Sequence, residues 1–378
     1  MKKLLCMVLS TVLAISSAAA LNMSAYADST NTQQVSYNYW YNSSTGYTDE
    51  NVHTRQMEKL DRGLIAIKTD GGVYLSWRLF DSEDNIFGSA DKNVSFNVYR
   101  DGKKISEVAT KTNYVDSTVG TNYSVAPVMN GVEGDKCDAV TVNENSYFDI
   151  PLSKPDDETI YDPSGNELAT YSFFPADCST GDIDGDGEYE IIVKWTSSEH
   201  DVGSPGDPAY SGTVHLAAYK LDGTKLWKND IALGKNVYSS AHTLQFLVYD
   251  FDGDGKSEVM CQTSLGSKDG QGKYVSNAAQ TDEEIKAITD KENSTADYRS
   301  SSGVITKGEE FLTVFNGETG AAMDTISLPT TRGSENGVDY GDDFGNRSNR
   351  FVSDIAYLDG EKPYAIYLRG YYFGRNGK

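Results

Sequence analysis

One acidic motif occurs twice in this chain, and similar strand-forming segments follow each copy. Aspartates stand at alternate positions, a glycine follows the third, and a glutamate comes three residues later: Asp182, Asp184, Asp186, Gly187 and Glu190, then Asp250, Asp252, Asp254, Gly255 and Glu258. Self-similarity over this length indicates a repeat architecture, in which each unit buries its apolar faces against its neighbours. The duplication therefore limits the possible folds more than any other feature of the sequence.

The segments after each motif predict β-strands. They are rich in β-branched and aromatic residues and are separated by turns, at 189–195, 213–219 and 225–227 in the first copy and at 257–261, 310–315 and 321–326 in the second. A third copy begins at 351–357, keeps only Asp359-Gly360 of the motif and continues at 364–368. Four-stranded antiparallel units in series are typical of a β-propeller, which closes with roughly four to eight blades. We therefore expect residues 146–378 to form the first blades of a propeller that is incomplete here.

The second copy contains an insertion between Leu265 and Glu309. It is polar and includes Thr281-Asp282-Glu283-Glu284. A threonine followed three residues later by glutamate is the signature of a capping box. We expect a short surface helix that starts at Thr281.

The acidic motif predicts a binding site for calcium (Ca2+), because hard cations take roughly six to eight oxygen ligands from sharply turned segments. An EF-hand would place a bidentate glutamate at the twelfth position, where this chain has Val193 and Cys261. These are therefore loops between strands. The expected ligands are the carboxylates of Asp182, Asp184, Asp186, Glu190, Asp250, Asp252, Asp254 and Glu258. Two interpretations stay open: calcium that only fastens the loop, and calcium that also contacts a substrate.

The N-terminus predicts export. Residues 1–27 combine a basic start, an apolar run from Leu4 to Ala20 and the small-residue site Ala25-Tyr26-Ala27, which together describe a secretory signal peptide. We expect a secreted, extracellular protein, with residues 28–54 as a polar lead-in or linker. Of the three cysteines after the signal, at most one pair could form a disulfide.

Charge limits the possible partners. The formal net charge is −23, and without Lys2 and Lys3 of the signal 31 basic residues face 56 acidic ones, giving −25. This balance argues against nucleic acid and anionic membranes as partners. We expect a monomer.

Residues 55–145 predict a β-sandwich. Short strands at 64–67, 73–77, 94–99 and 123–128 alternate with turn signals such as Asp101-Gly102. The strand ending in Leu75-Ser76-Trp77 and the later Phe96-Asn97-Val98-Tyr99-Arg100-Asp101-Gly102 resemble a fibronectin type III domain. The chain as a whole is thus expected to be all-β, a fibronectin type III-like sandwich followed by a partial propeller.

The order of these features resembles polysaccharide lyase family 11, the bacterial rhamnogalacturonan lyases. The matching stretches are Arg55–Gly63, Gly181–Trp195, Ala241–Gly255, Phe311–Phe315 and Gly345–Phe351. The resemblance implies an eight-bladed propeller that binds calcium and cleaves the rhamnogalacturonan I backbone of pectin by β-elimination. In such a reaction a cation near the uronate carboxylate stabilises the developing charge, and a basic side chain removes the proton.

The chain departs from the family pattern at four positions. The family has Asn where this chain has Ala176, Asp at Thr196, Lys at Gln262 and Asp at Leu265, and we expect the first two to flank the first loop on the sugar-facing side. The remaining candidates for catalysis are His242, which aligns with a family histidine, and three arginines that could hold a uronate carboxylate, Arg347, Arg350 and Arg369. Each has a structural alternative, as a hydrogen-bond donor or as the partner of an acid.

Two other functions fit parts of the pattern. A non-catalytic carbohydrate-binding propeller derived from the lyases would explain the four departures. An integrin-like adhesive propeller shares the acidic loops but does not predict the Arg55–Gly63 start.

Overall fold

The computed structural model describes residues 60–80, 83, 94–109, 111–197, 209–240, 243–330, 332, 340–342 and 344–370, and the backbone of short strands between residues 4 and 57. The chain divides into two compact units, residues 32–149 and residues 1–31 with 150–378. Three antiparallel pairs lie near the N-terminus: β1 (Leu4–Cys6) with β2 (Ala19–Leu21), β3 (Gln33–Tyr37) with β6 (His53–Met57), and β4 (Tyr41–Asn42) with β5 (Tyr47–Thr48). The segment expected as a polar lead-in or linker thus contains paired strands.

The unit of residues 32–149 contains two sheets around one core. One sheet has the order β11-β8-β7, and the other has β10-β9-β12-β13 with β14 also on β12. Their bounds are β7 (Ile65–Thr69), β8 (Gly72–Ser76), β9 (Val94–Arg100), β10 (Lys103–Val108), β11 (Asn113–Asp116), β12 (Asn122–Met129), β13 (Val132–Glu133) and β14 (Val140–Thr141). Alternate side chains from both sheets, including Leu75, Val98 and Val125, share one buried cluster. Trp77 packs edge-on against Phe96, with ring centroids 5.4 Å apart.

The larger unit contains consecutive antiparallel sheets, as the duplicated pattern predicted. A hairpin, β15 (Glu158–Tyr161) with β16 (Glu167–Tyr171), precedes the four-stranded sheet β17 (Phe174–Gly181), β18 (Glu190–Thr196), β19 (His215–Tyr219) and β20 (Ile231–Ala232). The second four-stranded sheet is β21 (Phe246–Tyr249), β22 (Glu258–Thr263), β23 (Phe311–Phe315) and β24 (Ala322–Ser327). A third sheet is the pair β25 (Phe351–Ala356) and β26 (Tyr364–Arg369). The described chain is nearly all-β, which confirms that part of the prediction.

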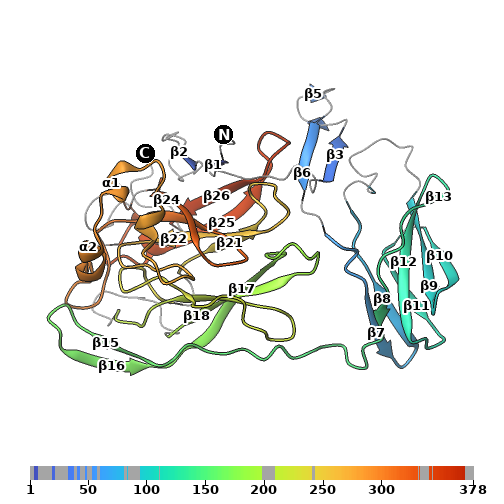
Figure 1. Ribbon diagram of the computed structural model, residues 1–378, viewed down its shortest axis with the longest axis horizontal. Helices are drawn as coiled ribbons and strands as arrows, with labels where there is room; N and C mark the ends of the chain where they lie inside the picture. Colours follow the sequence, from blue (N-terminus) through green and yellow to red (C-terminus); the bar gives the residue numbers. More distant parts are fainter. Residues whose placement is uncertain are drawn as a thin grey trace. The chain divides into compact units, whose positions relative to one another are not determined.

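These three sheets stack face to face. Successive side chains of a strand point to opposite faces of its sheet, so a strand of the middle sheet can contact both neighbouring sheets. In β22, Val259 and Cys261 enter the apolar cluster shared with the first sheet, whereas Met260 enters the cluster shared with the third. β23 alternates in the same way, with Phe311 and Phe315 on one side and Leu312 and Val314 on the other. Figure 1 shows the stack running from β17 and β18 to β25 and β26. The second sheet is therefore buried on both faces.

The fourth strand of the first sheet lies later in the sequence than expected. Residues 225–227 were expected to form it, but Lys225 makes only an isolated bridge to Tyr219, and the strand is β20. Trp227 is the reason, since its buried indole donates a 2.6 Å hydrogen bond to the carbonyl of Gly317 in the second repeat. A contact across 90 residues thus overrides the local strand propensity.

The insertion contains a 3₁₀ turn, η2 (Val275–Ala278), and two short helices, α1 (Glu283–Lys286) and α2 (Asp290–Thr295). The expected helix exists, but its cap is Asp282, whose carboxylate accepts from the amide of Ile285. The capping box belongs instead to Thr289 and Glu292, at the start of α2. The prediction of Thr281 as the cap was wrong because an aspartate one residue later is an equally good acceptor.

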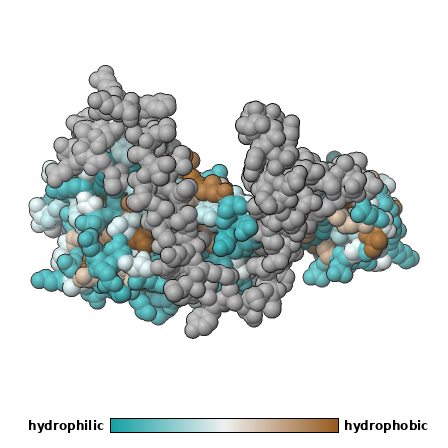
Figure 2. All heavy atoms as spheres, turned by 90° about the horizontal axis from the view of Figure 1, so that it is seen from above, coloured by the Kyte–Doolittle hydropathy of each residue, from teal (hydrophilic) through white to brown (hydrophobic). Residues whose placement is uncertain are grey.

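The described surface is mostly hydrophilic, with small and separate hydrophobic spots (Figure 2). Within the described residues, the helices are too short to cross a bilayer. Cys137, Cys178 and Cys261 are free thiols. The described part of the chain therefore depends on packing and hydrogen bonds rather than on disulfides.

Candidate functional site

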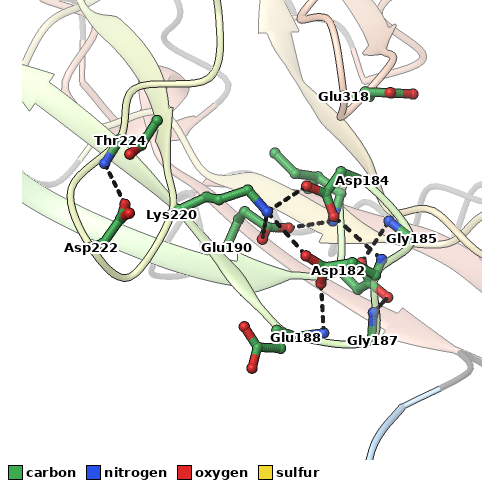
Figure 3. A network of polar contacts seen from close by, with 12 residues as sticks. Asp182, Asp184, Gly185, Gly187, Glu188, Glu190, Lys220, Asp222, Thr224 and Glu318 are labelled. Carbon is green, nitrogen blue, oxygen red and sulfur yellow. Dashed lines mark hydrogen bonds and ion pairs between the residues drawn. The ribbon is translucent and has the colours of Figure 1, made fainter.

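The first acidic loop connects β17 to β18 and is organised around Asp182. Its buried carboxylate accepts hydrogen bonds from the amides of Gly185 at 2.7 Å and Gly187 at 2.9 Å (Figure 3). Both glycines have positive φ angles, +82° and +93°, which other residues rarely adopt. Glu190, the first residue of β18, accepts from the amide of Ile183 at 3.0 Å. The sequence pattern thus dictates a tight turn lined by carboxylates.

The second loop connects β21 to β22 and repeats this geometry. Asp250 accepts from Gly253 at 2.6 Å and from Gly255 at 3.1 Å, and Glu258 accepts from Phe251 at 2.8 Å. Each bond matches one in the first loop. The duplicated sequence therefore encodes two copies of one turn.

Burial makes these carboxylates hard to ionise. Loss of solvent, followed by repulsion from neighbouring aspartates, raises the pKa of Asp250 to about 7. Burial also raises the pKa of Glu190 to about 7 and that of Glu258 well above its ordinary value. A bound divalent cation would offset both effects, since it replaces lost hydration and screens the repulsion.

The loops bring several predicted ligands within reach of one ion. Ligand oxygens of Asp182, Asp184 and Glu190 lie within 4.8 Å of one another, and so do those of Asp250, Asp252 and Asp254. Carboxylate oxygens in such a cluster suit a hard cation. Of the other predicted ligands, Asp186 pairs with a lysine and Glu258 bonds the backbone of its own loop.

Lys220, which follows β19, was missed by the sequence analysis. Its ammonium lies 2.7 Å from Asp184 Oδ2, 3.0 Å from Asp186 Oδ2 and 3.6 Å from Glu190 Oε1 (Figure 3). Hydrogen bonds to the two aspartates raise the pKa of Lys220, so it stays charged. The first loop therefore already contains a cation from the protein.

The four positions that depart from the family pattern lie at the opposite end of the sheets. Thr196 pairs with Phe174 in the register of β17 and β18, whereas Glu190 beside the loop pairs with Gly181. Thr196 lies six steps along the strand from Glu190, which at about 3.3 Å per residue is about 20 Å. The expectation that Ala176 and Thr196 flank the first loop was wrong, because both stand at the far ends of these strands.

Comparison with known proteins gives the family. The model of the rhamnogalacturonan I lyases beta-sheet domain matches residues 55–143, and that of the rhamnogalacturonan lyase family 11 C-terminal domain matches residues 147–375. The chain belongs to rhamnogalacturonan lyase family 11. This membership confirms the family that the sequence motifs indicated.

Named relatives of this family 11 chain include two proteins of Bacillus subtilis (strain 168). The chain is 45% identical over 321 residues to the rhamnogalacturonan endolyase YesW and 42% identical over 323 residues to the rhamnogalacturonan exolyase YesX. These alignments cover 84% of this chain but 46% and 47% of the relatives. The chain thus spans about half the length of the curated relatives it matches.

The solved structures that match this chain are also rhamnogalacturonan lyases. The crystal structure of exotype rhamnogalacturonan lyase YesX matches with a TM-score of 0.67 at 40% identity, covering 86% of this chain and 50% of that one. The Bacillus licheniformis rhamnogalacturonan lyase PL11 also matches with a TM-score of 0.67, at 44% identity, over 86% of this chain and 52% of that one.

In this family 11 chain, Arg369 lies in a buried ion-pair network at the end away from the loops. Its guanidinium contacts both carboxylate oxygens of Glu310, at 2.7 and 2.8 Å, and the carbonyls of Ser348 and Thr330. The side chain is fully buried, and Arg332 approaches the same glutamate at 2.8 Å. In this geometry Arg369 is the buried partner of an acid, which is the structural role expected as its alternative.

Two of the four departures occupy the same region. The Gln262 side chain donates to Glu310 Oε1 at 2.7 Å, which holds it inside the ion-pair network. Leu265 is buried in the core cluster between the first and second sheets. Neither position presents the polar group that the family pattern has there.

The other candidates for catalysis are less buried than Arg369 or lie outside the described residues. Arg347, in the 3₁₀ turn η4 (Arg347–Asn349), is one-third exposed and lies 4.0 Å from Asp342. Arg350 follows this turn and is partly buried. His242 lies outside the described residues. Arg347 and Arg350 are thus the predicted candidates whose side chains are partly exposed.

Lys194 is a second residue that the sequence analysis missed. It lies in the middle of β18, is fully buried, and donates to the carbonyls of Thr243 at 3.0 Å and Leu244 at 3.3 Å. Burial lowers its pKa. This lysine holds the segment after His242 against the first sheet. A lysine within an otherwise apolar strand was the available signal.

Proposed function

We propose that this protein is a secreted rhamnogalacturonan lyase that cleaves the rhamnogalacturonan I backbone of pectin by β-elimination. The observation that carries the proposal is the succession of two rhamnogalacturonan lyase domains along one chain, at 45% identity to an endolyase. Residues 1–27 support export as a signal peptide.

The expected chemistry needs a carboxylate holder and a base. The proton at C5 of the uronate goes to the base and a C4–C5 double bond forms. The C4–O bond breaks, and its oxygen leaves with the other part of the chain and takes up a proton. A guanidinium paired with the carboxylate stabilises the charge that develops. Arg347 and Arg350 are the partly exposed candidates for the holder, and His242, which precedes the segment fixed by Lys194, is the candidate for the base.

The proposed architecture is a fibronectin type III-like sandwich at 55–145 followed by the first blades of a propeller at 146–378. The stack of sheets with alternating buried faces supports blades. The fibronectin type III assignment rests on the strand pattern around Trp77.

Calcium is proposed as the ion of the acidic loops, and the carboxylate clusters support this choice. When bound, calcium supplies the positive charge that holds each turn together. Because the loops are about 20 Å of strand away from Thr196, we propose that they stabilise the sheets rather than contact the sugar.

A non-catalytic carbohydrate-binding propeller is the second candidate. It is favoured by Leu265, which is buried in a core cluster, and by Gln262, whose side-chain amide is held by Glu310. The protein is expected to be a monomer in either case.

One experiment separates these functions. The protein is incubated with rhamnogalacturonan I while the ultraviolet absorbance of the unsaturated uronate is followed, and binding is measured by affinity electrophoresis in gels containing the polysaccharide. A rise in absorbance that is lost in Arg347→Ala supports the lyase. Retarded migration with a flat absorbance trace supports the binding propeller, and neither signal contradicts both.

A further inference from the structure

The insertion between Leu265 and Glu309 forms one wall of a cavity of about 430 Å³, and the ends of β23 and β24 form the other. Cavities of roughly 300–1,000 Å³ are the usual size of small-molecule sites. Phe311, which lines the cavity, pairs with Thr263 and Ser327 where their strands end away from the acidic loop. The cavity therefore lies at the end of the sheets opposite the loops.

The floor of the cavity is apolar. Leu265, Ile285 and Phe311 are almost fully buried and belong to the core cluster of the first and second sheets. Ile288 and Ala296 are partly buried and pack against the same cluster. Aliphatic and aromatic surface of this kind contacts the C–H groups of a ligand. The cavity thus offers an apolar surface to one side of a bound molecule.

A buried asparagine, Asn236, holds one wall in place. Its side-chain nitrogen donates to the carbonyls of Leu265 at 2.8 Å and Ala296 at 3.1 Å. Its side-chain oxygen accepts from the amide of Tyr298 at 2.8 Å. One side chain therefore fixes the backbone of three residues that line the cavity.

The other wall is fastened by Asp282, the cap of α1. Its carboxylate accepts from the amide of Ser327 at 3.2 Å and from the hydroxyl of Ser327 at 2.8 Å. These bonds fix α1 beside the end of β24 (Figure 1). Both walls are thus held in shape by the protein itself, which is typical of ligand sites that are formed before binding.

The mouth of the cavity carries negative charge. Three exposed glutamates line it, Glu284, Glu292 and Glu309, and the described lining contains no lysine, arginine or histidine. Carboxylates accept strong hydrogen bonds from hydroxyl groups, and they repel another carboxylate. The cavity therefore suits a molecule that has an apolar side, several hydroxyl groups and no negative charge.

We propose that this cavity binds a neutral sugar and excludes a uronate. A pyranose ring combines C–H groups on its faces with hydroxyl groups at its edge, which matches the apolar floor and the acidic mouth. In the proposed substrate the neutral sugar is rhamnose, whose methyl group adds apolar surface, whereas galacturonate carries the charge that the glutamates repel. The choice of rhamnose rests on the proposed function, and the preference for a neutral sugar rests on the cavity.

Binding of single sugars tests the proposal without catalysis. Rhamnose and galacturonate are titrated separately into the full-chain protein, and saturation-transfer NMR measures binding. Ala296→Trp fills the cavity from its wall, and Thr295→Trp fills it from an exposed position at the rim, outside the core. Glu284→Gln removes one charge of the mouth. Glu283→Gln, on the preceding residue outside the lining, is the matched control.

Rhamnose should bind with a dissociation constant on the order of 1 mM, as expected for a ligand with few atoms. Galacturonate should bind about tenfold more weakly or not at all, because like charges meet at the mouth. Both tryptophan variants should weaken rhamnose binding by about tenfold or more. Glu284→Gln should reduce the preference for rhamnose, and Glu283→Gln should leave it unchanged.

Three results would overturn the proposal: no binding of rhamnose, galacturonate bound as tightly as rhamnose, or rhamnose bound equally well by the tryptophan variants. Cyclohexylamine is titrated in the same way, and tighter binding of this amine than of rhamnose would also overturn it, in favour of an organic cation. A flat absorbance trace with rhamnogalacturonan I, together with rhamnose binding at the cavity, would contradict the proposed lyase and not this site. The two failures are therefore distinguishable.

Discussion

The two ends of the stacked sheets hold charge in opposite ways. At the loop end, carboxylates gather around turns, and Lys256 and Glu318 form an ion pair of 2.5 Å with half of the glutamate exposed. At the other end, Arg369 and Glu310 form a pair of 2.7 Å that is almost completely buried. The distances are alike but the surroundings differ. The comparison teaches that burial, rather than distance, determines how much each pair matters to stability.

The difference also separates two tasks. The loop end gathers carboxylates that could hold a metal, and these carboxylates repel one another. The far end contains Thr196, Gln262 and Arg369, where charges are matched within the protein. Substrate contacts, if they follow the family pattern, belong to the far end. A metal bound in these loops would then act on stability and not on the reacting sugar.

Glu310→Gln should have the largest effect. It leaves Arg332 and Arg369 buried without their carboxylate, and breaking a buried pair costs about 3–5 kcal/mol. Glu309→Gln changes the neighbouring, exposed glutamate in the same way and should cost less than about 0.5 kcal/mol. Urea denaturation of both variants measures the difference. Equal losses would show that the network at the far end is not stabilising.

Removal of calcium should have the next largest effect. A ligand at about 100 times its dissociation constant stabilises the folded state by about 2.7 kcal/mol. Chelator should therefore lower the melting temperature by about 5–10 °C for a unit of this size. Asp250→Asn should remove much of this response. A melt that is unchanged by chelator would break the comparison, because the loop end would not need a metal.

The pH dependence of the calcium-free protein should be smaller for each carboxylate. The pKa of Asp250 and that of Glu190 are raised to about 7 in the folded state, so the folded protein binds protons more tightly than the unfolded chain. The resulting stability is fully present below the unfolded pKa, near 4, and is lost as pH rises through about 7. In chelator, the free energy of unfolding should therefore fall between pH 5 and pH 8, by about 2 kcal/mol for each of these two carboxylates.

Calcium should suppress this dependence, since metal and protons compete for the same carboxylates. Denaturation at several pH values with and without calcium measures both slopes. Asp250→Asn should flatten part of the slope in chelator. A calcium-free protein that becomes more stable from pH 5 to pH 8 would contradict the raised pKa values.

Much of this arrangement could be predicted from local sequence. The acidic loops are encoded within nine residues each, and their glycines require the turn that the structure has. The strands of the repeats follow from β-branched and aromatic runs. Period-two alternation in β22 and β23 even fixes which side chains face each neighbouring sheet.

What could not be predicted depends on distant residues. Lys220 reaches Asp186 from 34 positions later in the chain, and Arg369 reaches Glu310 from 59 positions later. The segment around Trp227 does not form the expected strand, because the indole of Trp227 donates a hydrogen bond to the carbonyl of Gly317. The position of Ala176 and Thr196 could have been inferred, since a whole strand separates them from the loop. Sequence spacing alone suggested proximity where strand geometry requires separation.

The smallest effect is expected at the exposed pair of the loop end. Lys256 and Glu318 are one-third and one-half exposed, so solvent screens them, and their coupling in a double-mutant cycle should be at most about 1 kcal/mol. Urea denaturation of Lys256→Ala, Glu318→Ala and the double variant gives the coupling. A value near that of Arg369 and Glu310 would mean that burial does not set the difference between the two ends.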